Sequence, residues 1–421
     1  MNYFNLFITV VFITSIHSVG STQIIEKRGY LYSEISAIIS SIPSIEDDSY
    51  RAPLDSELAT WENALVHLIE GDIVSASDSV NTIGYNLIHF IDTFDIITSD
   101  YYILETIDTN YWGTYVYNPS YCRPLILQSP HAIRDANTGL QGIHIFRQSE
   151  ALFYQVNGTH RCNSSDSSSC TGTTSSCSST STSEAYRISD LAHNIQSIFQ
   201  KTTEVLFRNF DESYFIQLHG FAKRDTDPYV ILSNGTNMIP SVDFLTEFKS
   251  NLQLEDPVLT FKVAHIDTDW NRLRGFWNTQ GRLINGEIDA CNEDAIKTSG
   301  RFFHIEQERT RLRSDTEGWN KVSDALNNTF DCDIISSAIN ENVAQINIYP
   351  NPCSNLVILS LNEEAEFDQN SFIYNLLGQN ISSYVDVIKE SNLKHTINVS
   401  RLPIGVYIIR VGNMSIKLYV N

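Results

Sequence analysis

The stretch RPLILQSPHAIRDANTG, residues Arg123–Gly139, predicts the framework of the central domain. It begins with the apolar run Pro124–Leu127, which is typical of a buried strand. Pro130 then ends the strand, because proline has no amide hydrogen to donate to the ladder. His131 and Asp135 follow this break directly. A rigid strand that delivers a histidine and a carboxylate into the loop at its end can build a metal site or an acid–base site.

The same order of an apolar strand followed by a polar cluster recurs within residues 111–335. Short apolar runs alternate there with helical patterns, which indicates an α/β domain with a mostly parallel sheet flanked by helices. The strands are expected at Leu125–Gln128, Leu152–Val156, Phe215–Leu218, Tyr229–Ser233 and Phe302–Ile305, and the helices at Thr138–Ser149, Ile188–Asn209 and Val242–Leu252. Ligands collect at the carboxyl ends of the strands in such sheets, so we expect the polar clusters to lie together.

The segments before this domain have a different pattern. Residues 1–22 contain the almost wholly apolar run Phe4–Ile16 followed by small polar residues, which predicts a cleaved export signal. Residues 23–110 carry amphipathic runs that predict a helical N-terminal segment, one from Leu58 to Ile69 and one from Val74 to Phe94. The Tyr- and Thr-rich stretch 101–121 predicts strands or a hairpin that lead into the central domain.

Composition narrows the classes of function. The 421 residues carry 50 acidic and 28 basic side chains, which gives a net charge of −22. This balance argues against nucleic acid as a partner, because phosphate binding requires clustered Lys and Arg. We expect no transmembrane segment after signal cleavage, since no later run is long and apolar enough. Seven cysteines permit disulfides and leave at least one thiol unpaired, and the Ser/Thr-rich stretch Asn163–Ser183 predicts a loop stapled by cysteines.

Histidines and carboxylates in the polar clusters could form a hydrolytic zinc site. Such a site requires three His or carboxylate ligands, an open position for water, and a nearby Glu that takes the proton from that water. His131, Asp135 and His219 can supply the ligands, and Glu306 can supply the base. The sequence therefore predicts Zn²⁺ as the cofactor.

Other members of the clusters could bind and orient a substrate. Arg161, Arg309 or Arg311 could hold a substrate carboxylate through a bidentate pair of hydrogen bonds. His160 or His193 could polarise the substrate, or could orient a metal ligand through a hydrogen bond.

The order of these motifs resembles a known superfamily. Four short motifs follow one another between Leu125 and Leu312, namely PHxxxD, THR, LHGF and IExxR. This is similar to the zinc-dependent superfamily of the zinc carboxypeptidases, the succinylglutamate desuccinylases and the N-formylglutamate amidohydrolases. The resemblance implies a zinc peptidase-like α/β fold and hydrolysis of a C–N bond in a peptide or N-acyl amino acid with a free carboxylate.

The resemblance also implies a role for individual residues. His131, Asp135 and His219 match the metal ligands, Glu306 matches the general base, and Arg161 matches the arginine that grips a carboxylate. The carboxylate ligand here is an Asp in HxxxD, whereas the carboxypeptidases have HxxE. A hydrolase fold that has lost its metal is therefore one alternative.

Each candidate residue also has a simpler structural interpretation. Asp135 could cap the following helix, and Asp190 in SDLAHN could cap another. Glu306 could belong to an ion-paired edge, and Arg161 could anchor the disulfide loop. The alternative function is a non-catalytic surface adhesin, or a glycan- or peptide-binding module, in which Tyr111–Tyr121 (YWGTYVYNPSY) would stack on sugars.

The C-terminal residues 345–421 follow an expected linker at residues 336–344 and have the most specific pattern in the chain. Short alternating strands separated by turns predict a small antiparallel β-sandwich. The segment resembles the type A C-terminal sorting domain of the type IX secretion system. The resemblance lies in the motifs YPNP, YNLLGQ and LPIGVYIIRV and in a closing strand with Lys417. The resemblance implies the type IX machinery as a partner, a secreted or outer-surface location, and removal of this domain on arrival.

Overall fold

The computed structural model divides the chain into two compact units, residues 1–334 and 335–421, and each is described by itself. The residues described are 24–45, 50–95, 98–107, 109–332, 346–349, 351, 353–361, 372–375, 379–391, 394–411 and 414–420. The expected export signal and the expected linker lie outside these residues.

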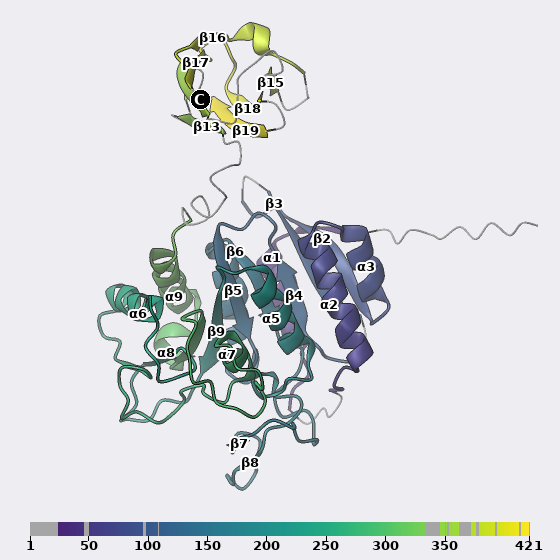
Figure 1. Ribbon diagram of the computed structural model, residues 1–421, viewed down its shortest axis with the longest axis vertical. Coiled ribbons are helices and arrows are strands. Elements are labelled where there is room, and N and C mark those ends of the chain that lie inside the picture. The colour runs from purple at the N-terminus through teal and green to yellow at the C-terminus, as the bar shows by residue number, and fades with distance from the viewer. Residues whose placement is uncertain are drawn as a thin grey trace, which may run out of the picture. The chain divides into compact units, whose positions relative to one another are not determined.

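The described part of the first unit is built on a ten-stranded mixed sheet (Figure 1). Its strands, in sheet order, are β1 (Ile25–Gly29), β2 (Tyr85–Asp92), β3 (Ser99–Thr106), β4 (Thr114–Tyr117), β6 (Ala151–Val156), β5 (Arg123–Ser129), β9 (Tyr214–Gly220), β12 (Phe302–Gln307), β10 (Val230–Ser233) and β11 (Phe261–Val263). The central strands β6, β5, β9 and β12 are parallel, and antiparallel pairs lie on both sides of them. This confirms the predicted α/β class, and all five predicted strands are present.

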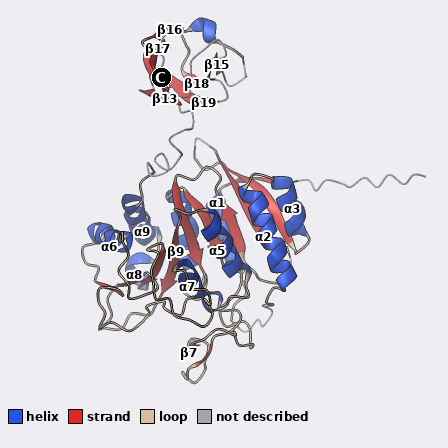
Figure 2. Cartoon of the chain, in the orientation of Figure 1, coloured by secondary structure: helices blue, strands red, loops and turns tan. Residues whose placement is uncertain are grey.

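Helices cover both faces of the sheet, as Figure 2 shows. One face packs against α1 (Leu31–Ser40), α4 (Thr138–Gln148), α6 (Phe244–Glu255) and α9 (Thr316–Thr329), and the other against α2 (Asp55–Ile69), α3 (Ile73–Asn81), α5 (Ile198–Asn209) and α7 (Thr279–Ile284). Along β5, Leu125 and Leu127 enter the first core and Ile126 enters the second. A strand buried on both faces has a nearly continuous apolar sequence, which explains the run Pro124–Leu127.

The prediction of a helical segment at residues 23–110 is wrong at β1 and in the second half of residues 74–94. Helix α3 ends at Asn81, and Gly84 then adopts a φ of 80°, which continues no helix. The segment from Tyr85 to Asp92 is strand β2, paired with β1 in parallel and with β3 in antiparallel register. Leu87 faces one core and Ile88 the other, so tertiary burial of both faces overrides the helical spacing. The strands expected within residues 101–121 are confirmed as β3 and β4.

The predicted helix Ile188–Asn209 begins ten residues late. Helix α5 starts at Ile198, because the Ser197 side chain accepts a hydrogen bond from the Gln200 amide and caps it there. The preceding residues instead form a short 3₁₀ turn at Leu191–His193. This turn carries residues of the candidate site described below.

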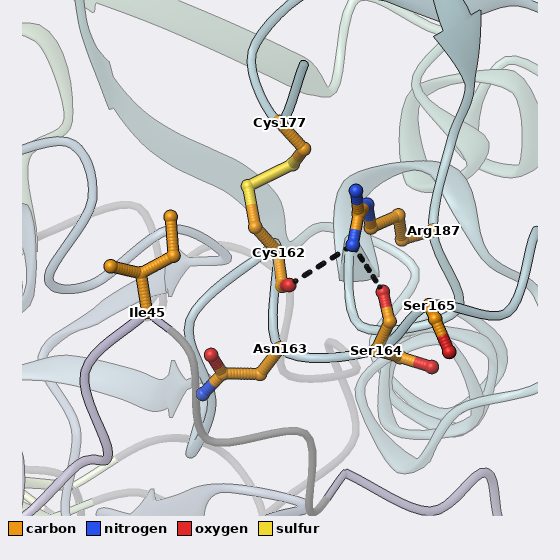
Figure 3. Close-up of a pocket in the computed structure, with 7 residues that line it drawn as sticks. All are labelled: Ile45, Cys162, Asn163, Ser164, Ser165, Cys177 and Arg187. Carbon is orange, nitrogen blue, oxygen red and sulfur yellow. Dashed lines mark hydrogen bonds between the residues drawn. A yellow bond between two sulfur atoms is a disulfide. The ribbon is translucent and has the colours of Figure 1, made fainter. Parts of the chain in front are cut away.

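Three disulfides fasten the described part of the first unit. They join Cys122 to Cys332, Cys162 to Cys177, and Cys170 to Cys291, while Cys353 in the second unit is free and buried. The Ser/Thr-rich insert is therefore a stapled loop, as expected. Strand β7 (Thr173–Thr174) lies inside it and pairs with β8 (Glu184–Ala185), which directly follows it. A pocket with a volume of about 240 Å³ lies beside the Cys162–Cys177 disulfide. Arg187 donates there to the Cys162 and Ser164 carbonyls (Figure 3).

The second unit is an antiparallel β-sandwich. One sheet contains β13 (Ile346–Tyr349), β14 (Leu356–Leu361), β17 (Lys394–Asn398) and β16 (Asp386–Lys389), and the other contains β15 (Phe372–Asn375), β18 (Gly405–Val411) and β19 (Met414–Val420). Val357 and Ile397 from the first sheet share one core with Ile409 and Leu418 from the second. The predicted sandwich is confirmed.

Candidate metal centre

Three neighbouring parallel strands bring the predicted site residues to one edge of the sheet. β9 lies between β5 and β12, and His219 is in register with Glu306 on β12. His131 follows the end of β5 by two residues. The carboxyl ends of these strands therefore meet, as the sequence predicts for an open α/β sheet.

The three predicted metal ligands lie together and are buried. Oδ2 of Asp135 is 3.2 Å from Nδ1 of His131 and 3.2 Å from Nδ1 of His219. One donor atom from each residue lies within 4.8 Å of the other two. The turn after β5 holds Asp135 in place, because its amide donates to the His131 carbonyl at 3.0 Å. The capping alternative for Asp135 does not hold, since Asn137 is the N-cap residue of α4.

A hydrogen bond through Nε2 fixes each of the two imidazoles. Nε2 of His131 donates to Oδ1 of Asp190 at 2.8 Å, and Nε2 of His219 donates to Oε1 of Gln217 at 2.7 Å. Each Nδ1 then turns its lone pair toward the carboxylate of Asp135. Such electron-rich atoms repel one another unless a proton or a cation lies between them. Two imidazole nitrogens and one carboxylate oxygen, each fixed by an outer partner, are a donor set that suits Zn²⁺.

The local charges favour a positive charge between these residues. Burial and Arg161 lower the pKa of His131, but Asp190 and Asp135 outweigh them and raise it above its ordinary value. Burial raises the pKa of Asp135, and His131 and His219 overcome it and hold that pKa well below the usual range. Burial, assisted by the charge of His131, lowers the pKa of His219 to about 4. The carboxylates of Asp190 and Asp135 therefore favour a positive charge at this point of the site.

Asp190 is a site residue, although the sequence suggested a helix cap. It stands at the N-cap position of the 3₁₀ turn but makes no capping bond with its side chain. Its buried carboxylate instead accepts hydrogen bonds from Nε2 of His131, from Nε and Nη2 of Arg161, and from Nδ1 of His193 at 3.1 Å. Only its place in a polar cluster with His193 could have indicated this role.

Glu306 is buried beside the predicted ligands, with 6% of its surface exposed. Burial, and then the negative charge of Asp135, raise its pKa to about 8. Among the described residues it forms no ion pair with an arginine, so the ion-paired-edge alternative does not hold. The neighbouring Glu308 has a structural role of another kind, because its side chain caps the short helix α8 (Arg309–Leu312).

The predicted arginines have different surroundings. Arg161 is buried in the site, where it pairs with Asp190 and places Nη1 3.5 Å from Nδ1 of His131. Arg311 pairs with Asp256 through Nε at 2.9 Å and Nη2 at 2.8 Å, and Arg309 is exposed on α8. The sequence did not single out Arg313, which is buried and donates to the Gln307 and Ala136 carbonyls near Asp135.

The two remaining predicted histidines flank Arg161 and Asp190. Nδ1 of His160 accepts a hydrogen bond from the Cys162 amide at 3.2 Å. Burial, followed by the charge of Arg134, lowers the pKa of His160 to about 4, so its ring is neutral. The ring of His193 stacks on Tyr186 at 3.7 Å between centroids. Both rings are therefore held in fixed orientations.

Comparison with known families identifies one part of the chain. Residues 347–420 match the family described as the secretion system C-terminal sorting domain. The second unit is a sorting domain. This confirms the type IX resemblance for the tail, and it implies export to the cell surface or medium through the secretion machinery. No curated protein matches the chain. No helix among the described residues is long and apolar enough to cross a membrane.

Proposed function

We propose that the first unit is an exported zinc-dependent hydrolase of C–N bonds, which acts on a peptide or an N-acyl amino acid with a free carboxylate. The observation that carries this proposal is the meeting of two anchored imidazoles on one carboxylate oxygen, each at 3.2 Å. Donor atoms gathered in this way from separate elements favour a cation site over a structural hydrogen-bond cluster.

The metal ligands in this proposal are His131, Asp135 and His219. When bound there, Zn²⁺ would supply Lewis acidity to the substrate carbonyl and to the attacking water. Asp190 and Gln217 hold the two imidazoles in the tautomer that leaves Nδ1 free.

Glu306 would accept the proton of the attacking water and pass it to the leaving nitrogen. In the metal-free protein its pKa of about 8 keeps it protonated at neutral pH. The negative charge of Asp135 is one of the two main causes of that high pKa, and a cation that neutralises Asp135 removes it. Glu306 would therefore become a carboxylate base when the metal site is filled.

Arg161 would attract the substrate carboxylate. Its Nη1 group faces His131, whereas Nε and Nη2 are committed to Asp190. The neutral imidazole of His160 lies next to it in the chain and would donate to the substrate carbonyl. The predicted roles of Arg309 and Arg311 in substrate binding remain proposals, and the pairing of Arg311 with Asp256 argues for a structural role.

The adhesin alternative has weaker support. The segment expected to stack on sugars contains Trp112, Tyr115 and Tyr117, and all three side chains are buried in the core of the first unit. Their rings are therefore unavailable for a flat sugar-binding surface.

The decisive experiment measures metal content and activity together. The full-length chain, its H131A/H219A double variant and an H144A control would be loaded with Zn²⁺, desalted and analysed by mass spectrometry. His144 bonds to Asn320 on an outer helix, outside the candidate site. Zinc in the wild type and control but not in the double variant, with cleavage of dipeptides or N-acyl amino acids, supports the proposal. Absence of zinc from all three proteins overturns it.

A further inference from the structure

A second group of donor atoms lies beside the first. His304 and Glu306 are two residues apart on β12, so their side chains project from the same face of the sheet. The ring of His304 lies 4.5 Å from the ring of His219 on the neighbouring strand, measured between centroids. One donor atom each from His219, His304 and Glu306 lies within 4.8 Å of the other two.

Two of these side chains carry buried polar atoms without a partner. Nδ1 of His304 and Oε2 of Glu306 have no hydrogen bond to any described residue, although only 4% and 6% of these residues are exposed. An unsatisfied buried donor or acceptor is costly, so such atoms usually have an unseen partner. Gly275 packs closely over the His304 ring, because a Cβ added there would lie 2.7 Å from it. The ring is therefore held where it is.

A third group, His131, Asp190 and His193, has similar spacing but does not suit a cation. The carboxylate of Asp190 already neutralises the guanidinium of Arg161 and accepts from both histidines. A metal ion there would have to displace a buried arginine. The group around His304 contains no such cation.

We propose that His304, Glu306 and His219 form a second divalent-cation site next to the first. Two imidazoles and one carboxylate select ions of the zinc class over Mg²⁺ and Ca²⁺, which prefer oxygen ligands. His304 belongs to this site alone and Asp135 to the first alone. His219 belongs to both, and because its Nε2 donates to Gln217, its one lone pair serves one cation at a time. This inference shares two groups with the proposed function, the ring of His219 and the carboxylate of Glu306, which is the base when the first site is filled.

The test counts cations in the full-length protein. The wild type, H304A, D135N, H219A and the H144A control would be stripped with a chelator, titrated with Zn²⁺ and Co²⁺, and analysed for stoichiometry. We expect one equivalent in the wild type, the control, H304A and D135N, because a cation that cannot fill one site fills the other. We expect none in H219A or in a D135N/H304A double variant. A milder H304Q variant covers the case in which H304A does not fold, as judged by circular dichroism.

The outcomes separate the two sites. One equivalent that D135N loses and H304A keeps overturns the second site and leaves the proposed function standing. One equivalent that H304A loses and D135N keeps supports the second site and overturns the proposed ligand set. Binding that H219A keeps overturns both.

Discussion

Oδ1 of Asp190 accepts a hydrogen bond from Nε2 of His131 at 2.8 Å, on the side of the ring that faces away from Asp135. The bond fixes which nitrogen of His131 carries the proton, and it leaves Nδ1 to a metal. We expect D190N to weaken zinc affinity by roughly 10- to 100-fold, because an amide aligns the ring without adding negative charge. Competition with a fluorescent chelator measures the effect. D227N removes a buried Asp–Arg pair elsewhere and should leave affinity unchanged; equal losses in both variants would contradict the role of Asp190.

Glu306 is the proposed base, and its removal should affect rate more than binding. We expect E306Q to lower kcat by about 10²- to 10⁴-fold, the usual contribution of a positioned general base. The zinc bound by His131, Asp135 and His219 should remain, since the amide is isosteric. Steady-state kinetics on a cleaved dipeptide, with metal analysis of the same sample, checks this. Full activity in E306Q would assign the base to another group.

The pair formed by Asp256 and Arg311 should make stability depend on pH in acid. Hydrogen bonds from Arg311, and then from Lys321, lower the pKa of Asp256 to about 2. The unfolded chain has the ordinary, higher pKa, so it binds the proton first as the pH falls. The contribution of this pair is complete above about pH 4 and is lost between about pH 4 and pH 2.

We therefore expect D256N to reduce the unfolding free energy by about 1 to 2 kcal/mol at pH 6 and by much less at pH 2. Urea unfolding at a series of pH values measures this difference. D269N is the matched control, because the side chain of Asp269 is 87% exposed. A D256N effect that is the same at both pH values would show that the ion pair does not cause it.

Gly220 lies against the guanidinium of Arg313, where an added Cβ would overlap its atoms. We expect G220A to destabilise the first unit by about 1 to 3 kcal/mol, as for other overpacked sites. The displaced Arg313 would lose its bonds to the Ala136 and Gln307 carbonyls, so zinc affinity should fall as well. Gly29 on β1 has room for a methyl group, 3.7 Å from Phe90, and G29A should be nearly neutral. The midpoints of thermal unfolding of G220A and G29A, compared with the wild type, test this prediction.

The two disulfides of the insert should differ in their contribution to stability. Cys170–Cys291 closes a loop of 121 residues and Cys162–Cys177 one of 15. By loop-closure entropy their removal costs about 5 and about 3 kcal/mol respectively. Urea unfolding of C170A/C291A and C162A/C177A tests the order. A larger loss from the shorter loop would show that local packing, rather than chain entropy, dominates.

The framework of the site could be predicted because it follows from local patterns. Short, mostly apolar runs marked β5, β9 and β12. The rule for parallel sheets then placed His131, His219 and Glu306 at one edge. The second unit was predicted for the same reason, since its strands and turns each have a local signature.

The missed features depend on contacts between distant residues. Asp190 resembled a helix cap, and its contacts with His131 and Arg161, which lie 59 and 29 residues earlier in the chain, show its role. Strand β2 had helical spacing, and its partners on β1 and β3 decided its conformation. His304 precedes Glu306 by two residues, but its unpartnered nitrogen is visible only in three dimensions.

The disulfide between Cys122 and Cys332 has a mechanical consequence for an exported protein. Cys332 is the last described residue before the boundary between the units, and Cys122 directly precedes β5. Any tension transmitted from the sorting domain during export enters the first unit at Cys332. The covalent link passes that load into the base of the central strand, so the load does not peel α9 from the sheet one turn at a time.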